Sequence, residues 1–125
     1  DMSYTLHVWE QPADAPFPSQ LIEAFDAIDA LSQEAMPANS KFPAFAARLT
    51  ARHPCICSEA GRNNPAWSDG PLDGDAESGV YVIGLNSDRV GEVQPFVVAE
   101  ARQLGLNVMD EQTGQVYLAN GKVLS

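Results

Sequence analysis

The sequence predicts an α+β protein: a two-layer sandwich in which a single sheet of about four to five strands carries helices mainly on one face. Two observations lead to this class. Segments with strand-like alternation or β-branched composition occur near both ends of the chain, and three segments with helical spacing of apolar residues lie among them. The 125 residues suit a single domain over residues 1–125, and neither an internal repeat nor a linker divides them.

The chain opens with a predicted strand over Tyr4–Trp9, in which Tyr4, Leu6 and Val8 share one face. Three prolines in residues 11–18 indicate a connecting loop. Ser19 is then expected to cap a first helix. The inner face of this helix comprises Leu21, Ala24, Phe25, Ile28, Leu31 and Ala35, and its outer face carries Glu23, Asp26, Asp29 and Glu34.

A second, shorter helix is expected after a break at residues 37–40. Phe42, Phe45 and Leu49 recur at helical spacing there, and Pro54 ends the pattern. Residues 55–79 hold several glycines and prolines and little periodicity. So long a segment without regular structure predicts a functional loop, or one that contains an element the pattern does not reveal, such as a short strand at residues 67–69.

The run Val80–Leu85 is apolar and rich in β-branched residues, which is typical of a central strand covered on both faces. Residues 86–88 supply caps for a third helix, which Gly105 ends. The inner stripe of that helix comprises Val93, Phe96, Val97, Ala101 and Leu104. Further strands are expected at Leu106–Met109, at Gln115–Ala119 after a turn over 110–114, and at Val123–Leu124.

The charge balance is the strongest functional signal. Seventeen acidic residues face seven Lys and Arg residues, which gives a formal net charge of −10. Four of the acids, Asp69, Asp73, Asp75 and Glu77, lie within nine residues. Such a chain repels nucleic acid and anionic membranes and attracts a basic protein partner through long-range steering. We expect it to bind that partner as a monomer or weak dimer.

The composition also bears on location. No apolar run approaches the roughly 18 residues that cross a bilayer. The first residues show no basic segment followed by an apolar stretch, so no secretory signal is expected there. These features predict a cytoplasmic protein.

The sequence holds no complete catalytic motif. His7 and His53 are the two histidines, and neither belongs to a Gly-x-Ser-x-Gly or HExxH pattern. No pair among the seventeen acids is distinguished as an acid and base for hydrolysis. We therefore expect no enzymatic activity, no catalytic residue and no cofactor.

Two sequence patterns superficially suggest a metal. Cys55 and Cys57, with His53 nearby, offer three soft ligands, but a structural zinc site takes four. A disulfide between such close cysteines closes a strained ring, so two reduced thiols are expected. In the second pattern, residues 73, 75 and 77 match the first ligands of an EF-hand loop, but its sixth and twelfth positions are Ser78 and Gly84. We expect no metal site.

The segments that carry a family resemblance span most of the chain. They are the opening strand 3–9, residues 67–72, the apolar strand 80–85, Pro95–Val97 of the third helix, and the strand 105–110 with the turn at Gly114. Together they resemble small bacterial proteins of polymorphic toxin systems that are presumed to be immunity proteins. The resemblance implies an inhibitor that covers the active site of a toxin, and it transfers no catalytic residue. Residues 53–57 have no counterpart in that family.

Charge and resemblance together predict an immunity protein that inhibits a basic, nuclease-like toxin. Its partner-binding residues would be Trp67, Asp69, Asp73, Asp75 and Glu77, with the tryptophan as an aromatic anchor. In the alternative for Trp67, the ring plugs the edge of the core. The acids of the first helix are an alternative contact surface.

Two other functional classes stay open. One is a small enzyme with a site built from dispersed residues such as His7, Cys55 or the loop acids. The other is a module that associates with itself through an exposed edge of the C-terminal hairpin.

Overall fold

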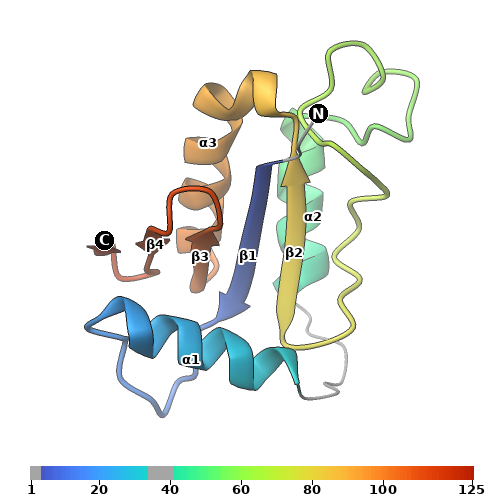
Figure 1. Cartoon of the computed structure of the whole chain (residues 1–125). Helices are drawn as coiled ribbons and strands as arrows, with labels where there is room; N and C mark the ends of the chain where they lie inside the picture. The colour runs from blue at the N-terminus through green and yellow to red at the C-terminus, as the bar shows by residue number, and fades with distance from the viewer. Residues whose placement is uncertain (1–3, 34–40) are drawn as a thin grey trace.

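The computed structural model describes residues 4–33 and 41–125 (Figure 1). The expectations for Glu34, Ala35 and the break at 37–40 lie outside these residues. In chain order the elements are β1 (Tyr4–Glu10), α1 (Leu21–Ser32), α2 (Lys41–Arg52), β2 (Val80–Leu85), the short 3₁₀ helix η1 (Ser87–Arg89), α3 (Val90–Gln103), β3 (Leu106–Asp110), β4 (Val116–Tyr117) and β5 (Val123–Leu124).

The described strands form one antiparallel sheet in the order β2-β1-β3-β4-β5. One sheet with three α-helices confirms the predicted α+β class. The sheet order shows that the prediction of a central strand at Val80–Leu85 is wrong, because β2 lies at one end and β1 lies inside, between β2 and β3. The expected cover on both faces is wrong as well, because the side chain of Val82 in β2 is 54% exposed. An apolar run does not report the position of the strand in the sheet.

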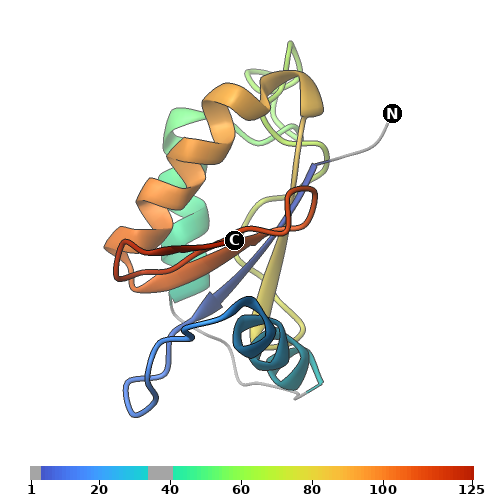
Figure 2. The ribbon, with the colours of Figure 1, turned by 60° about the vertical axis from the view of Figure 1, so that its left-hand side comes forward.

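The helices are divided between the two faces of the sheet. Helices α2 and α3 cover one face, whereas α1 lies against the other face at one end (Figure 2). Strand β1 serves both layers: Leu6 and Val8 are fully buried in the larger core beneath α2 and α3, and Trp9 is buried in a smaller core beneath α1. The alternation of side chains along a strand explains this division. Helices therefore lie mainly on one face, as expected, and α1 is the exception.

Local signals explain the helix boundaries. The carboxylate of Glu23 accepts hydrogen bonds from the backbone N–H groups of Ser19 (2.8 Å) and Gln20 (3.2 Å), so the cap of α1 is a capping box centred on Gln20 rather than on Ser19. At the start of η1 the side chain of Asn86 accepts a hydrogen bond from the backbone N–H of Asp88 (3.1 Å). Gly105, with φ +73°, follows α3 and turns the chain into β3.

Within the described ranges, no helix combines the length and the apolar composition that a membrane crossing requires.

Candidate functional site

Residues 69–77, here called the acidic segment, run along the outer edge of β2 (Figure 1). Just before the segment in the chain, Trp67 forms one antiparallel bridge with Leu85, and the N–H of Ser68 donates to the carbonyl of Gly84 (2.9 Å). Just after it, the N–H of Gly79 donates to the carbonyl of Leu31 in α1 (3.2 Å). The long region without helices is thus tied to the sheet at one end and to α1 at the other. The sequence suggested a short strand at residues 67–69. The structure has only the isolated bridge at Trp67 there.

The acidic segment alternates between inward and outward residues. Leu72 and Ala76 pack against the larger core, whereas Asp73, Asp75 and Glu77 are exposed. The three carboxylates are therefore accessible to solvent, although Gly74, with φ +83°, interrupts the extended backbone and the carboxylate of Asp73 accepts a hydrogen bond from the N–H of Asp75 (2.9 Å). Asp69 is exposed as well. Among the described residues, no Lys or Arg forms an ion pair with any of these four acids.

Gly74 holds the middle of the acidic segment close to α2. Its φ is +83°, and a side-chain carbon at this position would collide with the backbone of Phe42 and Pro43. Its N–H donates to the hydroxyl of Tyr81 in β2 (2.9 Å). Burial raises the pKa of Tyr81, the hydrogen bond from Gly74 opposes that rise, and the charges of Asp73, Asp69 and Asp75 add to it. These three carboxylates therefore lie close enough to Tyr81 for their charges to act on its hydroxyl.

Trp67 lies in the core. Its side chain is 0% exposed, and its indole N–H donates to the carbonyl of His53 (2.7 Å). A ring with no accessible surface cannot contact a partner, so the expectation that Trp67 anchors an interface does not fit this packing. The alternative reading, in which the ring plugs the edge of the core, describes its place. Trp67 supports the acidic segment from within.

The structure around the two cysteines also differs from the prediction. Cys55 and Cys57 form a disulfide, so the prediction of two reduced thiols is wrong. The backbone between them bends so that their α-carbons lie 5.1 Å apart, within the usual span of such a bond. Neither sulfur is therefore free to act as a nucleophile. In the part of the chain that the structure describes, no three His, Cys, Asp or Glu side chains gather in a way that could hold a metal ion.

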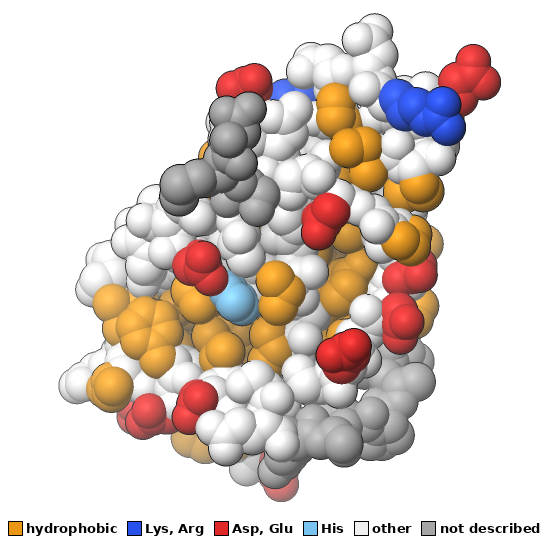
Figure 3. Space-filling view, turned by 45° about the vertical axis from the view of Figure 1, so that its right-hand side comes forward, with side chains coloured by type: hydrophobic (Ala, Val, Ile, Leu, Met, Phe, Trp, Pro, Cys, Tyr) orange, Lys and Arg blue, Asp and Glu red, His pale blue; other side chains and the backbone are white. Residues whose placement is uncertain are grey.

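The side of the sheet opposite α2 and α3 is covered only in part by described residues. Beyond α1 it presents Thr5, His7, Val82, Gly84 and Met109, here called the open face. The side chain of Val82 is 54% exposed. Asp69 borders this face, because its Oδ1 lies 3.0 Å from where a side-chain carbon on Gly84 would be. Figure 3 shows hydrophobic side chains gathered on this side of the molecule, with acidic side chains around them.

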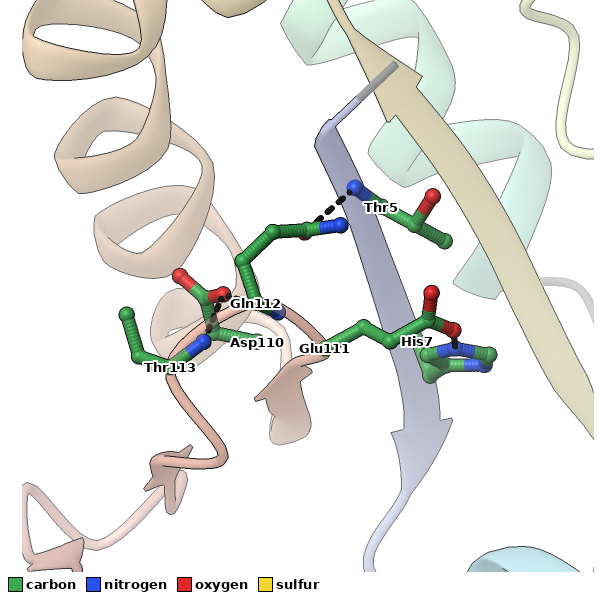
Figure 4. Close-up of polar contacts among 6 residues, drawn as sticks. All are labelled: Thr5, His7, Asp110, Glu111, Gln112 and Thr113. Atoms are coloured by element: carbon green, nitrogen blue, oxygen red, sulfur yellow. Dashed lines mark hydrogen bonds and ion pairs between the residues drawn. The ribbon is translucent and has the colours of Figure 1, made fainter. Parts of the chain in front are cut away.

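The turn after β3 forms another margin of the open face (Figure 4). The buried carboxylate of Asp110 accepts hydrogen bonds from the hydroxyl of Tyr4 (2.5 Å) and from the backbone N–H groups of Gln112 (3.0 Å) and Thr113 (3.1 Å). Burial raises the pKa of Tyr4, and the bond to Asp110 raises it further. These contacts fix the turn against β1.

The fixed turn places two side chains over β1. Glu111 Oε1 lies 2.8 Å from His7 Nε2, and the side-chain oxygen of Gln112 accepts from the N–H of Thr5 (2.9 Å) (Figure 4). A histidine paired with a carboxylate is part of an acid–base arrangement. The hydrogen bonds of the described residues bring no Ser, Thr or Cys side chain to the His7 ring. The pair therefore fastens the turn without completing a nucleophilic site.

Basic residues are concentrated on the other side of the sheet. Five of the seven lie in α2, η1 and α3: Lys41, Arg48, Arg52, Arg89 and Arg102. Several are engaged there in ion pairs, such as Arg48 with Glu100 (3.7 Å) and Arg89 with Glu92 (2.8 Å). Helix α1 carries Glu23, Asp26 and Asp29 and no Lys or Arg at all. The open face is thus bordered by two acidic elements, α1 and the acidic segment.

No protein-family model matches this chain, and neither do any curated proteins or solved structures. Sequence reasoning located the acids but missed the open face. The signal was present in β1, where Thr5 and His7 alternate with the buried Leu6 and Val8, whereas residues 80–85 are apolar throughout and gave no sign that Val82 is exposed.

Proposed function

We propose that this chain is a non-enzymatic immunity protein that inhibits a basic, nuclease-like toxin by covering its active cleft. The observation that carries the proposal is the exposure of Asp73, Asp75 and Glu77, with Asp69 in the same segment and no described Lys or Arg paired to any of the four. Nuclease clefts are basic because they bind phosphates, so this cluster of carboxylates complements them.

The attachment of the acidic segment to the rest of the protein favours a binding role for its acids over a role in solubility alone. Gly74 and Tyr81 hold the acidic segment to the body of the protein, so little conformational freedom is lost when a partner is bound. The negative field also speeds encounter with a cationic partner. The protein would act in the cytoplasm, where such a toxin meets its substrate, as a monomer or weak dimer and without a cofactor.

The proposal places a toxin gene next to the gene for this chain, and co-expression with the domain that such a gene encodes tests it. The test variant combines Asp73→Asn, Asp75→Asn and Glu77→Gln. The control combines Asp14→Asn, Glu59→Gln and Asp88→Asn, which remove the same charges from exposed positions elsewhere. We expect the test variant to lose protection and the control to keep it.

The toxin activity assay gives the quantitative form of this test. The inhibition constant should rise by about tenfold or more in the test variant, since each lost charge pair contributes up to about 1 kcal/mol. Equal inhibition by both variants at low salt, or inhibition by the unaltered protein that raised salt leaves undiminished, would remove the acidic segment from the mechanism.

One observation favours a second candidate, a small enzyme: the His7–Glu111 pair on the open face. Hydrolysis of nitrophenyl esters and phosphodiesters by the purified protein, abolished by His7→Gln, would support this candidate over the inhibitor. We expect no such turnover.

A further inference from the structure

A hollow of about 280 Å³ opens between α1 and β3, beside the open face. Its lining comes from Phe25, Ile28, Asp29 and Ser32 of α1 and from Met109 of β3. This volume is at the lower end of the range of about 300–1,000 Å³ that is usual for small-molecule sites, and it is large enough for a single long side chain.

The lining combines apolar surface with one carboxylate. Phe25 is 37% exposed, and Ile28 and Met109 are partly buried. Asp29 is exposed, and no described Lys or Arg forms an ion pair with it. An apolar wall with an acid at its mouth matches a long side chain that has an aliphatic stem and a cationic end.

We propose that this hollow receives an arginine side chain of the basic partner; this rests on the proposed function and names the contact that the partner makes with the open face. The stem of the arginine packs against Ile28 and Met109. The planar guanidinium stacks on the exposed ring of Phe25 and donates to the carboxylate of Asp29. Arginine is favoured over lysine because only its flat head can use the ring and the carboxylate together.

The charge distribution supports this occupant. The hollow lies on the side of the sheet where α1 provides acids and no base, so the surrounding field attracts a cation. The acidic segment borders the same open face along β2, so one basic partner can contact both. The sequence offered the acids of α1 as an alternative contact surface. In this proposal they and the acidic segment belong to one partner-binding surface around the open face.

The test uses butylguanidinium, an arginine side-chain analogue, with the full-length protein, and it follows the Met109 methyl and Phe25 ring signals by NMR. We expect saturable shifts of both signals. Asp29→Asn should weaken the affinity by about threefold, as expected for an exposed ion pair. Asp26→Asn, which removes a charge from the same helix outside the hollow, is the matched control.

Two further probes make the result decisive. Butylammonium should bind more weakly than butylguanidinium, and neutral N-butylurea more weakly still. Equal binding of the neutral probe, or shifts that never saturate at Phe25 and Met109, would overturn the inference. Because these probes need no toxin, the hollow can fail this test while protection by the acidic segment stands, and protection can fail while the hollow binds the probe.

Discussion

The two sides of the sheet differ in what their side chains do. Beneath α2 and α3, large apolar residues such as Phe42, Phe45 and Trp67 are almost completely buried, and some cations of these helices, such as Arg48, pair with nearby acids. On the opposite side, beyond α1, Val82 is exposed and the acids of the acidic segment have no described Lys or Arg partner. The first side mainly stabilises the fold. The second leaves groups available for another molecule.

This division follows from the period of a strand. Neighbouring residues of β1 and β2 point to opposite sides, so each strand contributes to the core and to the open face at once. Substitutions at adjacent positions of one strand should therefore have very different consequences for stability.

The largest expected effect separates Ile83 from Val82. Ile83 is 1% exposed and Val82 is 54% exposed, although they are adjacent in β2. Ile83→Ala should lower the free energy of unfolding by about 2–5 kcal/mol because it leaves a cavity in the core. Val82→Ala should change it by less than about 1 kcal/mol. Urea denaturation measures both, and similar losses would show that the open face is not open.

The next prediction concerns the attachment of the acidic segment. Gly74→Ala should lower the free energy of unfolding by more than about 1 kcal/mol, because its φ of +83° and the adjacent backbone of Phe42 leave no room for a side chain. Gly91 in α3 has nothing within 4 Å of the same position. Gly91→Ala is thus the control, and it should be neutral or stabilising by up to about 1 kcal/mol. Destabilisation by both variants alike would contradict the close approach of the segment to α2.

A third prediction uses pH. His53 is buried, and its Nε2 has no hydrogen-bond partner among the described residues. Burial lowers its pKa below the ordinary 6.5, and Arg89 lowers it further. The unfolded chain then binds more protons below pH 6.5 than the folded one, so stability falls as the pH falls through that value toward the folded pKa.

Thermal unfolding between pH 7.5 and 5 measures this effect. His53→Gln should flatten the decline of the melting temperature over that range, whereas His7→Gln, on the other side of the sheet, should retain it. An unchanged slope in His53→Gln would mean that another group titrates in that window. The lowered pKa values of Glu23 and Glu92 matter only below their ordinary 4.5, in a separate acid range.

The smallest expected effect is on the stability of the acid variants. Asp73→Asn, Asp75→Asn and Glu77→Gln alter exposed side chains, and each should shift the free energy of unfolding by no more than about 0.5 kcal/mol. Calorimetry checks this. A large loss would assign the acids to folding and remove the contrast between the two sides.

The sequence predicts the class of fold well because helical and strand periods survive in short windows. The spacing of Phe42, Phe45 and Leu49 and the cap at Asn86 both have the expected counterparts in α2 and η1. The order of strands was not accessible in the same way, because the continuous apolar run belongs to β2 at the end of the sheet and the pairing of the strands depends on contacts far apart in the chain.

The candidate site could be predicted from the sequence only in part. The acids at 69–77 are visible in the composition, and their exposure follows from the alternation with Leu72 and Ala76. The burial of Trp67 depends on a bridge to Leu85 and a bond to His53, which no local pattern encodes. The pairing of His7 with Glu111 spans 104 residues of sequence and requires the assembled sheet.

The rate of association with the toxin domain as ionic strength rises tests the central claim most directly. If the carboxylates of the open side recruit a basic partner, the rate constant should fall steeply between about 0.02 and 0.5 M salt. That fall should be shallower in the variant lacking the charges of Asp73, Asp75 and Glu77 and unchanged in the variant lacking those of Asp14, Glu59 and Asp88. A rate that ignores salt, or falls equally in all three proteins, would contradict the account.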